Sequence, residues 1–384
     1  MPAMNRSLLS LAIAPLLLSC AVSAAQPRDT PAAAADAALP YRLKVVAEGL
    51  EFPWSLAFLP DGRMLVTERP GRLRIVAADG ALSPPITGVP TVFAQRQGGL
   101  LDVALDPAFE QNRWVYLSYA EPDGAGLAGT AVARGKLVGN ALEAVEVIYR
   151  QVPKSEGGLH FGSRLAFAPD GTLFITQGDR YLHKDLAQTL DNDFGKTVRI
   201  HPDGSIPTDN PFVKTPGARP EIWSYGHRNM QGAAIHPVTG ALWTHEHGAM
   251  GGDEVNLDQA GRNYGWPVIT WGINYDGQPI GIGSEKAGME QPLTYWKPSI
   301  APSGMAFYTA DKFPDWRGNL FVGSMKFGYL NRIELDGTRV INEQPLLKEL
   351  DARIRCVRQG PDGFLYVTTD SPTGAVLRLE PPRR

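Results

Sequence analysis

The amino-acid sequence predicts an all-β fold, a six-bladed β-propeller, and three observations support this expectation. The 384 residues include 41 Gly and 32 Pro, a composition typical of many short strands joined by turns. A pair of short apolar strands recurs six times along the chain, in three copies around a Pro-Asp-Gly turn. Successive copies lie 47, 62, 68, 77 and 47 residues apart, which suits four-stranded blades of about 40–50 residues with insertions. The prolines that mark them are Pro60, Pro107, Pro169, Pro237, Pro314 and Pro361.

The paired strands are expected, in chain order, within residues 55–66, 101–117, 165–175, 232–243, 304–322 and 356–367. Radial repetition hides the edges of the sheets, and the inner strands converge on a central channel where binding sites lie. The sequence therefore predicts one propeller domain at residues 41–384, whose first and last strands close the ring. A β-sandwich with coincidental turns is the alternative interpretation.

The N-terminal residues 1–25 are predicted to be a signal peptide. Arg6 precedes an apolar run at residues 8–18 that is too short to span a bilayer. Cys20 stands in a lipoprotein-like signal, so a lipid anchor at Cys20 is the alternative to simple secretion. Residues 26–40, rich in Ala and Pro, are interpreted as a disordered leader. The protein is therefore expected to be exported to the periplasm with no transmembrane span, and Cys356 is expected to have no disulfide partner.

Three other kinds of site are not supported. The formal net charge of −3 provides no general attraction to nucleic acid. Gly124–Gly129 match a dinucleotide-binding pattern, but the residues that follow are typical of a strand, so no helix N-terminus is present to bind a pyrophosphate. His245-Glu246-His247 lacks the spacing of a zinc motif, and we do not interpret it as a metal site.

The third strand pair carries two residues that suit acid–base chemistry. Its strands alternate with period two and are joined at Asp170-Gly171, a strong hairpin signal. The turn closes one end of the hairpin, so the open ends, which carry His160 and Asp179, should lie together. A carboxylate beside an imidazole fixes its tautomer and raises its basicity, which makes a general base. The alternative is a surface histidine beside an unrelated aspartate.

Cationic and oxygen-rich segments suggest two further sites. Arg228, Lys326, Arg353 and Arg355 stand at the ends of repeats, which in a propeller face one mouth and would suit a ligand with several carboxylates. Glycines beside carboxylates at residues 246–256 could bring together the 6–8 oxygen ligands of Ca²⁺. The alternatives are scattered solvated charges and a tight surface turn.

Several segments, in this order, resemble the soluble pyrroloquinoline quinone (PQQ)-dependent aldose sugar dehydrogenases, relatives of soluble glucose dehydrogenase. The resemblance covers about residues 41–380. Its strongest motifs are Gln97–Val103, His160–Leu165, Tyr225–Asn229, Glu246–Gly248, Gly251–Glu254 and Asn263–Pro267.

The resemblance implies oxidation of the C1 hydroxyl of aldose sugars to lactones, with hydride transfer to PQQ. His160 corresponds to the base that removes the hydroxyl proton, and Asp179 to the carboxylate behind it. Arg228 would stabilise negative charge on the quinone oxygen. The positions that match the surroundings of the cofactor are Gln97, Arg228, Asn229, Tyr275, Ser324, Met325, Lys326, Arg353, Ile354 and Arg355.

The resemblance also implies calcium. Glu254 and the carbonyl of Tyr264 match a structural Ca²⁺ site, and the carbonyls of Gly248 and Ala249 match ligands of the Ca²⁺ that bridges to PQQ. Ala249 and Met230 replace prolines usual in the family, so these loops are less constrained in φ.

The expected partners are aldose sugars and an unidentified electron acceptor, for a monomer or a homodimer. A calcium-dependent propeller lactonase and a non-catalytic exported binding propeller are the alternative functions.

Overall fold

The computed structural model describes residues 39–382. The predicted signal peptide, the possible anchor at Cys20 and residues 26–38 of the predicted leader therefore lie outside the described residues. Within residues 39–382, no helix is long and apolar enough to cross a membrane.

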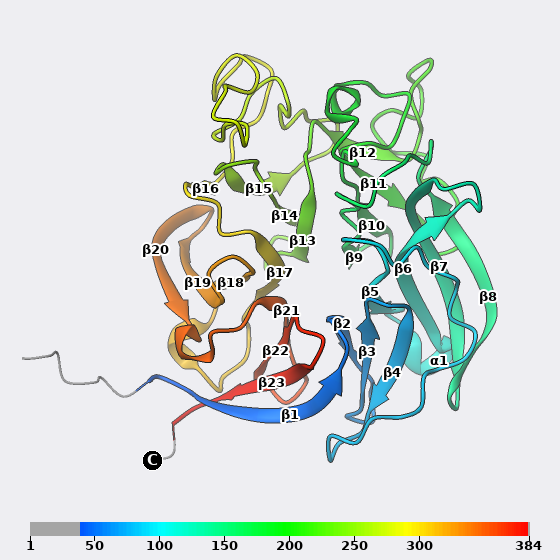
Figure 1. The fold of residues 1–384 in the computed structure, drawn as a ribbon, viewed down its shortest axis with the longest axis vertical. Helices are drawn as coiled ribbons and strands as arrows, with labels where there is room; N and C mark the ends of the chain where they lie inside the picture. Colours follow the sequence, from blue (N-terminus) through cyan, green and yellow to red (C-terminus); the bar gives the residue numbers. More distant parts are fainter. Residues whose placement is uncertain (1–38, 383–384) are drawn as a thin grey trace, which may run out of the picture. The chain divides into compact units, whose positions relative to one another are not determined.

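Six antiparallel sheets are arranged around a ring, so the predicted six-bladed propeller is confirmed (Figure 1). The first three blades are β2 (Pro53–Phe58), β3 (Met64–Glu68) and β4 (Arg72–Val76); β5 (Leu100–Leu105), β6 (Trp114–Pro122), β7 (Ala128–Val138) and β8 (Ala141–Arg150); and β9 (Leu165–Phe167), β10 (Leu173–Thr176), β11 (Lys196–Ile200) and β12 (Ile222–Tyr225).

The other three blades have four strands each, and the last includes the first strand of the chain. They are β13 (Met230–Ile235), β14 (Leu242–Glu246), β15 (Asp253–Asp258) and β16 (Thr294–Trp296); β17 (Pro302–Phe307), β18 (Leu320–Ser324), β19 (Tyr329–Asp336) and β20 (Arg339–Leu346); and β21 (Ile354–Gln359), β22 (Leu365–Thr369), β23 (Gly374–Glu380) and β1 (Arg42–Leu50). The helical segments are α1 (Phe109–Asn112) and the 3₁₀ helices η1 (Lys184–Gln188), η2 (Pro314–Trp316) and η3 (Lys348–Leu350).

The ring closes through the two ends of the chain. β1 pairs with β23 in antiparallel register, from Arg42 opposite Glu380 to Leu50 opposite Gly374. This strand completes the last blade and covers its edge, which would otherwise present unpaired backbone groups. The sequence predicts this closure, and the structure confirms it.

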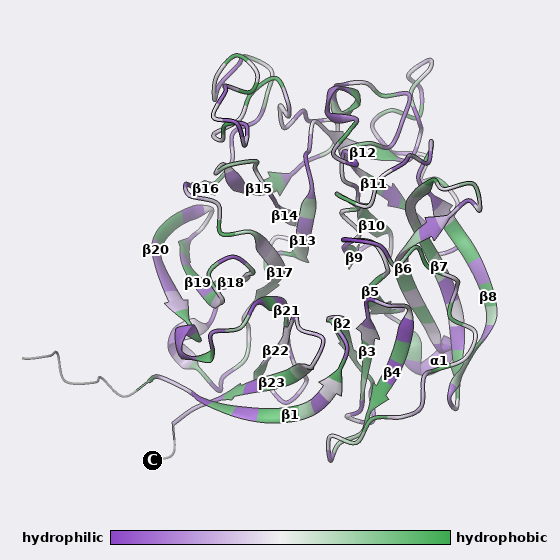
Figure 2. Cartoon of the chain, viewed as in Figure 1, coloured by the Kyte–Doolittle hydropathy of each residue, from purple (hydrophilic) through white to green (hydrophobic). Residues whose placement is uncertain are grey.

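The core is divided among the six contacts between neighbouring blades, each of which has its own cluster of buried apolar residues. Because neighbours cover both faces of a blade, strands such as β3, β10 and β14 are buried at every position. The outer strands β1 and β8 instead carry both hydrophobic and hydrophilic residues, most of them exposed or half-buried (Figure 2). The blades thus stack side by side around a central channel.

The innermost strands β2, β5, β9, β13, β17 and β21 run in the same direction, because all blades have the same topology. We call the face at which these strands begin the mouth of the ring. In each blade, the turn between the first and second strands lies on the opposite face. The loop that follows the second strand lies at the mouth.

A buried cluster of charges joins four blades at the centre of the ring. Asp102 accepts hydrogen bonds from Ser55 Oγ at 2.5 Å, Arg164 at 3.3 Å and Arg358 at 3.2 Å. Asp102 and Arg164 are fully buried, and the Arg164 guanidinium lies 4.0 Å from the centre of the Trp54 ring. One carboxylate therefore connects the first, second, third and last blades.

Candidate active site

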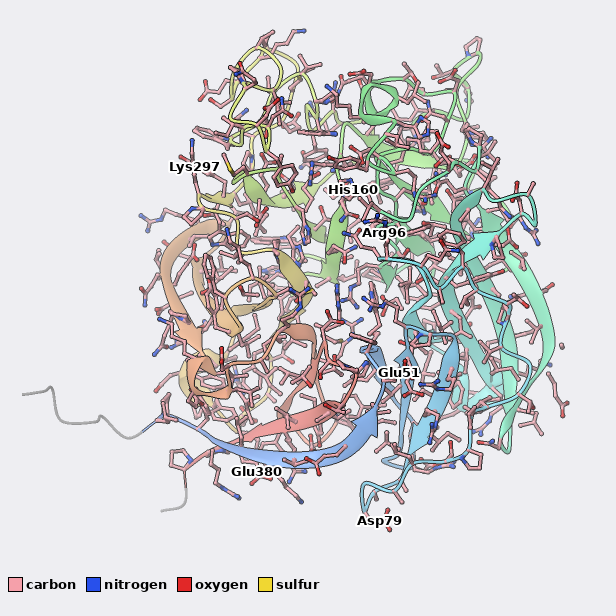
Figure 3. All side chains as sticks on the ribbon, viewed as in Figure 1. Glu51, Asp79, Arg96, His160, Lys297 and Glu380 are labelled. Atoms are coloured by element: carbon pink, nitrogen blue, oxygen red, sulfur yellow. The ribbon has the colours of Figure 1, made fainter. Side chains whose placement is uncertain are left out.

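The β9–β10 hairpin brings His160 and Asp179 together, as its sequence predicts. Leu173 lies opposite Phe167 and Ile175 opposite Leu165, and the turn residue Gly171 has a φ of +82°. At the open end, His160 Nδ1 lies 2.7 Å from Asp179 Oδ1, and both side chains are buried. Figure 3 labels His160 and, close to it in this view, Arg96.

The backbone around His160 is held in an unusual conformation. His160 has a φ of +53°, and its N–H donates to Gln97 Oε1 at 2.8 Å. Gly178 approaches so closely that a Cβ there would lie 2.1 Å from the His160 carbonyl oxygen. A strained residue that is fixed by its surroundings is typical of a functional site.

Burial and charge set the ionisation of this pair. Burial is the main cause that lowers the pKa of His160, and Arg228 lowers it further, whereas Asp179 raises it. For Asp179, burial raises the pKa, but the charges of His160 and Arg228 and two donated hydrogen bonds outweigh it and lower the pKa. The pair is therefore a neutral imidazole beside a carboxylate at neutral pH.

Arg228 lies between this pair and the segment after β14. Its carbonyl accepts from Asp179 N at 2.8 Å, and its guanidinium donates to the carbonyl of Gly248 at 2.5 Å. Asn229 Oδ1 accepts from Gly162 N at 3.1 Å. The Nε atom of Arg228 and the Nδ2 atom of Asn229 are buried without a hydrogen-bond partner among the described residues. These donors are available to a ligand.

A cavity of about 240 Å³ opens beside these residues at the mouth. Arg69, Arg353 and Arg355 surround Asp370 at 4.0, 3.2 and 3.6 Å, so three guanidinium groups face one carboxylate. Burial lowers the pKa of Arg355 to about 10, which leaves it charged at neutral pH. The lining residues are Trp54, Arg69, Gln97, Leu101, Phe161, Gly162, Gln231, His247, Ala301, Met325, Arg353 and Arg355.

A smaller cavity, about 10 Å³ in volume, brings together most of the residues expected to bind calcium. Glu254 and Glu246 both line it, and burial together with the charge of Glu246 raises the pKa of Glu254. Gly248 and Tyr264 line the same cavity, whereas Ala249 is buried beside Gly248 and does not. Two carboxylates and nearby carbonyl groups form a donor set of oxygens that suits a hard cation.

Five of the residues expected near the cofactor line neither cavity: Asn229, Tyr275, Ser324, Lys326 and Ile354. Tyr275 is 65% exposed, and the Lys326 ammonium lies 5.2 Å from the centre of the Phe327 ring, out in the solvent. Ser324 donates to the carbonyl of Ile300 at 2.8 Å, and Ile354 is part of a hydrophobic cluster. Gln97, Met325, Arg353 and Arg355 do line the larger cavity.

The structure adds residues that the sequence reasoning missed. Arg69 directly follows the second strand of the first repeat, and this position lies at the mouth. Its place in the repeat could have identified Arg69 as a site residue. Trp266 lies within the Asn263–Pro267 motif and donates from its indole to Asp179 Oδ2 at 2.8 Å. No local pattern relates Trp266 to Asp179, because 87 residues separate them.

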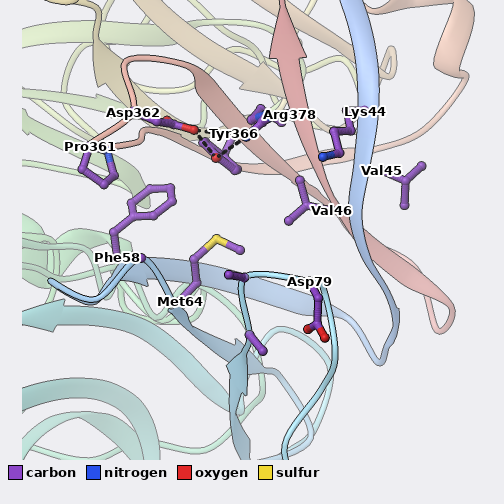
Figure 4. Close-up of a pocket in the computed structure, with 13 residues that line it drawn as sticks. Lys44, Val45, Val46, Phe58, Met64, Asp79, Pro361, Asp362, Tyr366 and Arg378 are labelled. Carbon is purple, nitrogen blue, oxygen red and sulfur yellow. Dashed lines mark hydrogen bonds and ion pairs between the residues drawn. The ribbon is translucent and has the colours of Figure 1, made fainter.

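A third cavity, of about 330 Å³, lies on the opposite face of the ring, between the first and last blades (Figure 4). It contains Phe58 at the end of β2 and Pro361 in a turn, together with Lys44 and Arg378. None of the predicted site residues lines this cavity.

Comparisons with known proteins agree with this geometry. Residues 50–378 match the family described as glucose/sorbosone dehydrogenase. The chain is 49% identical to the aldose sugar dehydrogenase YliI of Escherichia coli K12 over 344 residues, which cover 88% of this chain and 92% of that protein. The crystal structure of the soluble E. coli aldose sugar dehydrogenase in its apo form covers 89% of this chain and all of its own, at 48% identity and a TM-score of 0.87.

A more distant structure, the PQQ-bound aldose sugar dehydrogenase of Streptomyces coelicolor, is 30% identical with a TM-score of 0.72, over 88% of this chain and 98% of its own. The fold and these similarities define the protein as a β-propeller dehydrogenase. The chain belongs to the glucose/sorbosone dehydrogenase family. The family resemblance predicted from the motifs is thereby confirmed.

Proposed function

We propose that the protein oxidises the C1 hydroxyl of aldose sugars to lactones, with PQQ and Ca²⁺ as cofactors. The observation that carries the proposal is the His160–Asp179 pair, at 2.7 Å, beside a cavity that three arginines make cationic. The names of the relatives, aldose sugar dehydrogenase and a PQQ-bound form, support the same substrate class and cofactor.

The residues at the mouth fit PQQ, which has three carboxylates. Arg69, Arg353 and Arg355 provide more positive charge than Asp370 neutralises. Arg228 Nε and Arg355 Nε are buried donors without partners within residues 39–382, and a bound carboxylate or carbonyl would satisfy them. When bound, PQQ would accept the two electrons of the sugar as a hydride.

His160 would act as the general base. In the neutral imidazole, Nδ1 donates its proton to Asp179, so the free lone pair is on Nε2. Nε2 would accept the proton of the C1 hydroxyl as the C1–H bond breaks and the C=O bond of the lactone forms. Asp179 would then stabilise the imidazolium, and Arg228 would stabilise negative charge that develops on the cofactor side.

The smaller cavity fits Ca²⁺. Glu246 and Glu254 line this cavity together with Gly248 and Tyr264. A cation there would relieve the repulsion between the two glutamates and would supply a Lewis acid next to the cofactor site. The carbonyl of Gly248, at the smaller cavity, accepts from Arg228, and His247 lines both cavities.

A purified sample tests the proposal directly. Addition of PQQ, CaCl₂ and an aldose should bleach an artificial electron acceptor dye, and omission of PQQ should abolish the bleaching. Loss of an added lactone without dye reduction would instead indicate the calcium-dependent lactonase, and neither reaction would indicate a binding propeller.

We also propose that the protein is exported to the periplasm and that residues 1–25 are a signal peptide that is removed. Residues 26–40 would then form a leader, and residues 41–384 would form the propeller domain. N-terminal sequencing of the mature protein tests this, because cleavage after residue 24 or 25 supports secretion. A mature N-terminus at a lipid-modified Cys20 would indicate the anchored form.

A further inference from the structure

We infer that Trp266 is a positioning residue for the His160–Asp179 pair: its indole N–H holds Asp179 Oδ2, so that Oδ1 stays on His160 Nδ1. The inference rests on the proposed function in one respect, that His160 is the base. It concerns a residue outside the hairpin that carries the pair.

The two oxygens of Asp179 have separate partners. Oδ1 accepts from His160 Nδ1 at 2.7 Å and from Tyr181 N at 2.7 Å. Oδ2 accepts from Trp266 Nε1 at 2.8 Å, and it has no second protein donor among residues 39–382. Because the carboxylate is buried, the indole replaces the water that would otherwise solvate Oδ2.

The indole is itself held from several elements. Trp266 N donates to the carbonyl of Gly226 at 2.8 Å, just after β12, and its own carbonyl accepts from Gln188 Nε2 at 2.7 Å. Its ring is buried with Ala187, at η1, and with Ile280. The direction of the N–H is therefore set by contacts outside the β9–β10 hairpin.

This arrangement fixes the rotation of the carboxylate. Asp179 has two oxygens that could each face His160, and rotation about its terminal bond is soft. A donor on Oδ2 keeps that oxygen turned away from the imidazole, in the way that outer-shell hydrogen bonds orient the groups that bind metals. Loss of the N–H would leave a buried carboxylate oxygen without a donor and would let the carboxylate turn.

The same ring also contacts Arg228, whose guanidinium carbon lies 5.2 Å from its centre. A phenylalanine would keep an aromatic face toward Arg228 while it removes the N–H. Trp266→Phe is therefore the variant that tests the hydrogen bond. Trp271→Phe is the matched control, because Trp271 Nε1 is buried without a hydrogen-bond partner among the described residues and its ring stacks on Tyr295 at 4.0 Å.

The first measurement is the proton NMR resonance of His160 Nδ1–H in the cofactor-free protein, assigned by its loss in His160→Gln. We expect Trp266→Phe to shift or broaden this resonance and Trp271→Phe to leave it in place. An unchanged resonance in Trp266→Phe, or the same change in both variants, would overturn the inference. If Trp266→Phe does not fold, benzothienylalanine at position 266, which replaces the N–H by sulfur in a ring of the same shape, gives the same comparison.

The second measurement separates positioning from packing. In the protein loaded with PQQ and Ca²⁺, Trp266→Phe should lower kcat by about 10- to 100-fold, while KM for the aldose and the affinity for PQQ change by less than about threefold. Equal losses of kcat and PQQ affinity would contradict a positioning role. If the parent protein oxidises no aldose, the proposed function fails, whereas the NMR comparison still decides the inference.

Discussion

At the residue scale, two opposing influences act on the ionisation of His160. Burial and the charges of Arg228 and Arg180 favour the neutral imidazole, and the carboxylate of Asp179 favours the imidazolium. The sequence predicts only the influence of Asp179, because the burial of His160 depends on the packing of the mouth. Together these influences lower the pKa of His160, so its imidazole is already unprotonated at neutral pH before a substrate binds.

We expect His160→Ala to lower turnover by about 10²- to 10⁴-fold, the range typical of the loss of a general base. The affinity for PQQ should remain nearly unchanged, because the arginines of the larger cavity provide the opposing charge. Asp179→Asn should reduce turnover less, since the base remains. Steady-state kinetics and a PQQ binding titration check both variants, and parental turnover in His160→Ala would remove His160 from the mechanism.

The pH dependence of kcat/KM provides a related prediction. Since the base must be neutral, activity should be lost as pH falls through the pKa of His160, which lies below its usual value of 6.5. Asp179 raises this pKa, so Asp179→Asn should move the acid limb to still lower pH. A limb that moves to higher pH in Asp179→Asn would show that the carboxylate does not act on His160.

At the element scale, Lys196 fixes the loop that connects Asp179 to β11. Its ammonium is buried and donates to the carbonyls of Leu186, Ala187 and Phe194 at 3.0, 3.2 and 2.5 Å, and in the described part of the chain it has no carboxylate partner. Burial lowers the pKa of Lys196 to about 7. The ammonium thus joins the first residue of β11 to the 3₁₀ helix η1, beside the segment that carries Tyr181.

Lys196→Met should leave these three carbonyls without their common donor and should loosen residues 184–194. We expect a loss of about 1–3 kcal/mol in the free energy of unfolding and faster hydrogen exchange in this loop. Lys184→Met provides the control, because its exposed ammonium lies 3.8 Å from Asp185, whose side chain is also exposed. Equal exchange rates in the two variants would contradict the anchoring role of Lys196.

The loop between β14 and β15 supports a prediction about calcium. If Glu246 and Glu254 bind Ca²⁺ only in the folded state, the ion stabilises the protein by mass action, by about 2.7 kcal/mol at a hundredfold excess over Kd. Excess chelator should therefore lower the Tm, and Glu254→Gln should reduce this response. A Tm that does not respond to the chelator would exclude a structural calcium ion at this loop.

At the scale of the whole molecule, Asp102 connects blades that are distant in the sequence. Its carboxylate contacts Ser55 in β2, Arg164 before β9 and Arg358 in β21, the last of these across 256 residues. The ring is therefore closed twice, by the backbone pairing of β1 with β23 and by these charges at its centre.

Asp102→Asn should destabilise the fold by about 3–5 kcal/mol, because two guanidinium groups would lose their common counter-charge in a buried position. Urea unfolding of the variant measures this loss. Asp336→Asn removes one partner of an exposed ion pair with Arg339, at 2.8 Å, and should cost less than about 1 kcal/mol. Similar losses in the two variants would show that the central cluster contributes no more than a surface pair.

The sequence by itself determined the architecture and the central pair of the site. The six strand pairs, the closure by the terminal strands and the approach of His160 to Asp179 depend on period-two alternation and on turns such as Asp170-Gly171, which are local and therefore visible in a single sequence. The resemblance of several motifs then indicated the family, and the match of residues 50–378 confirms it.

Only the tertiary structure decided which distant residues meet. The indole of Trp266 reaches Asp179 across 87 residues, Arg69 joins Arg353 and Arg355 around Asp370, and Tyr275 remains exposed. Such contacts depend on how the blades are arranged around the ring and on the paths of the loops between them. The physical reason is that strand alternation and turn chemistry act over a few residues, whereas the contacts of a buried side chain depend on every segment packed around it.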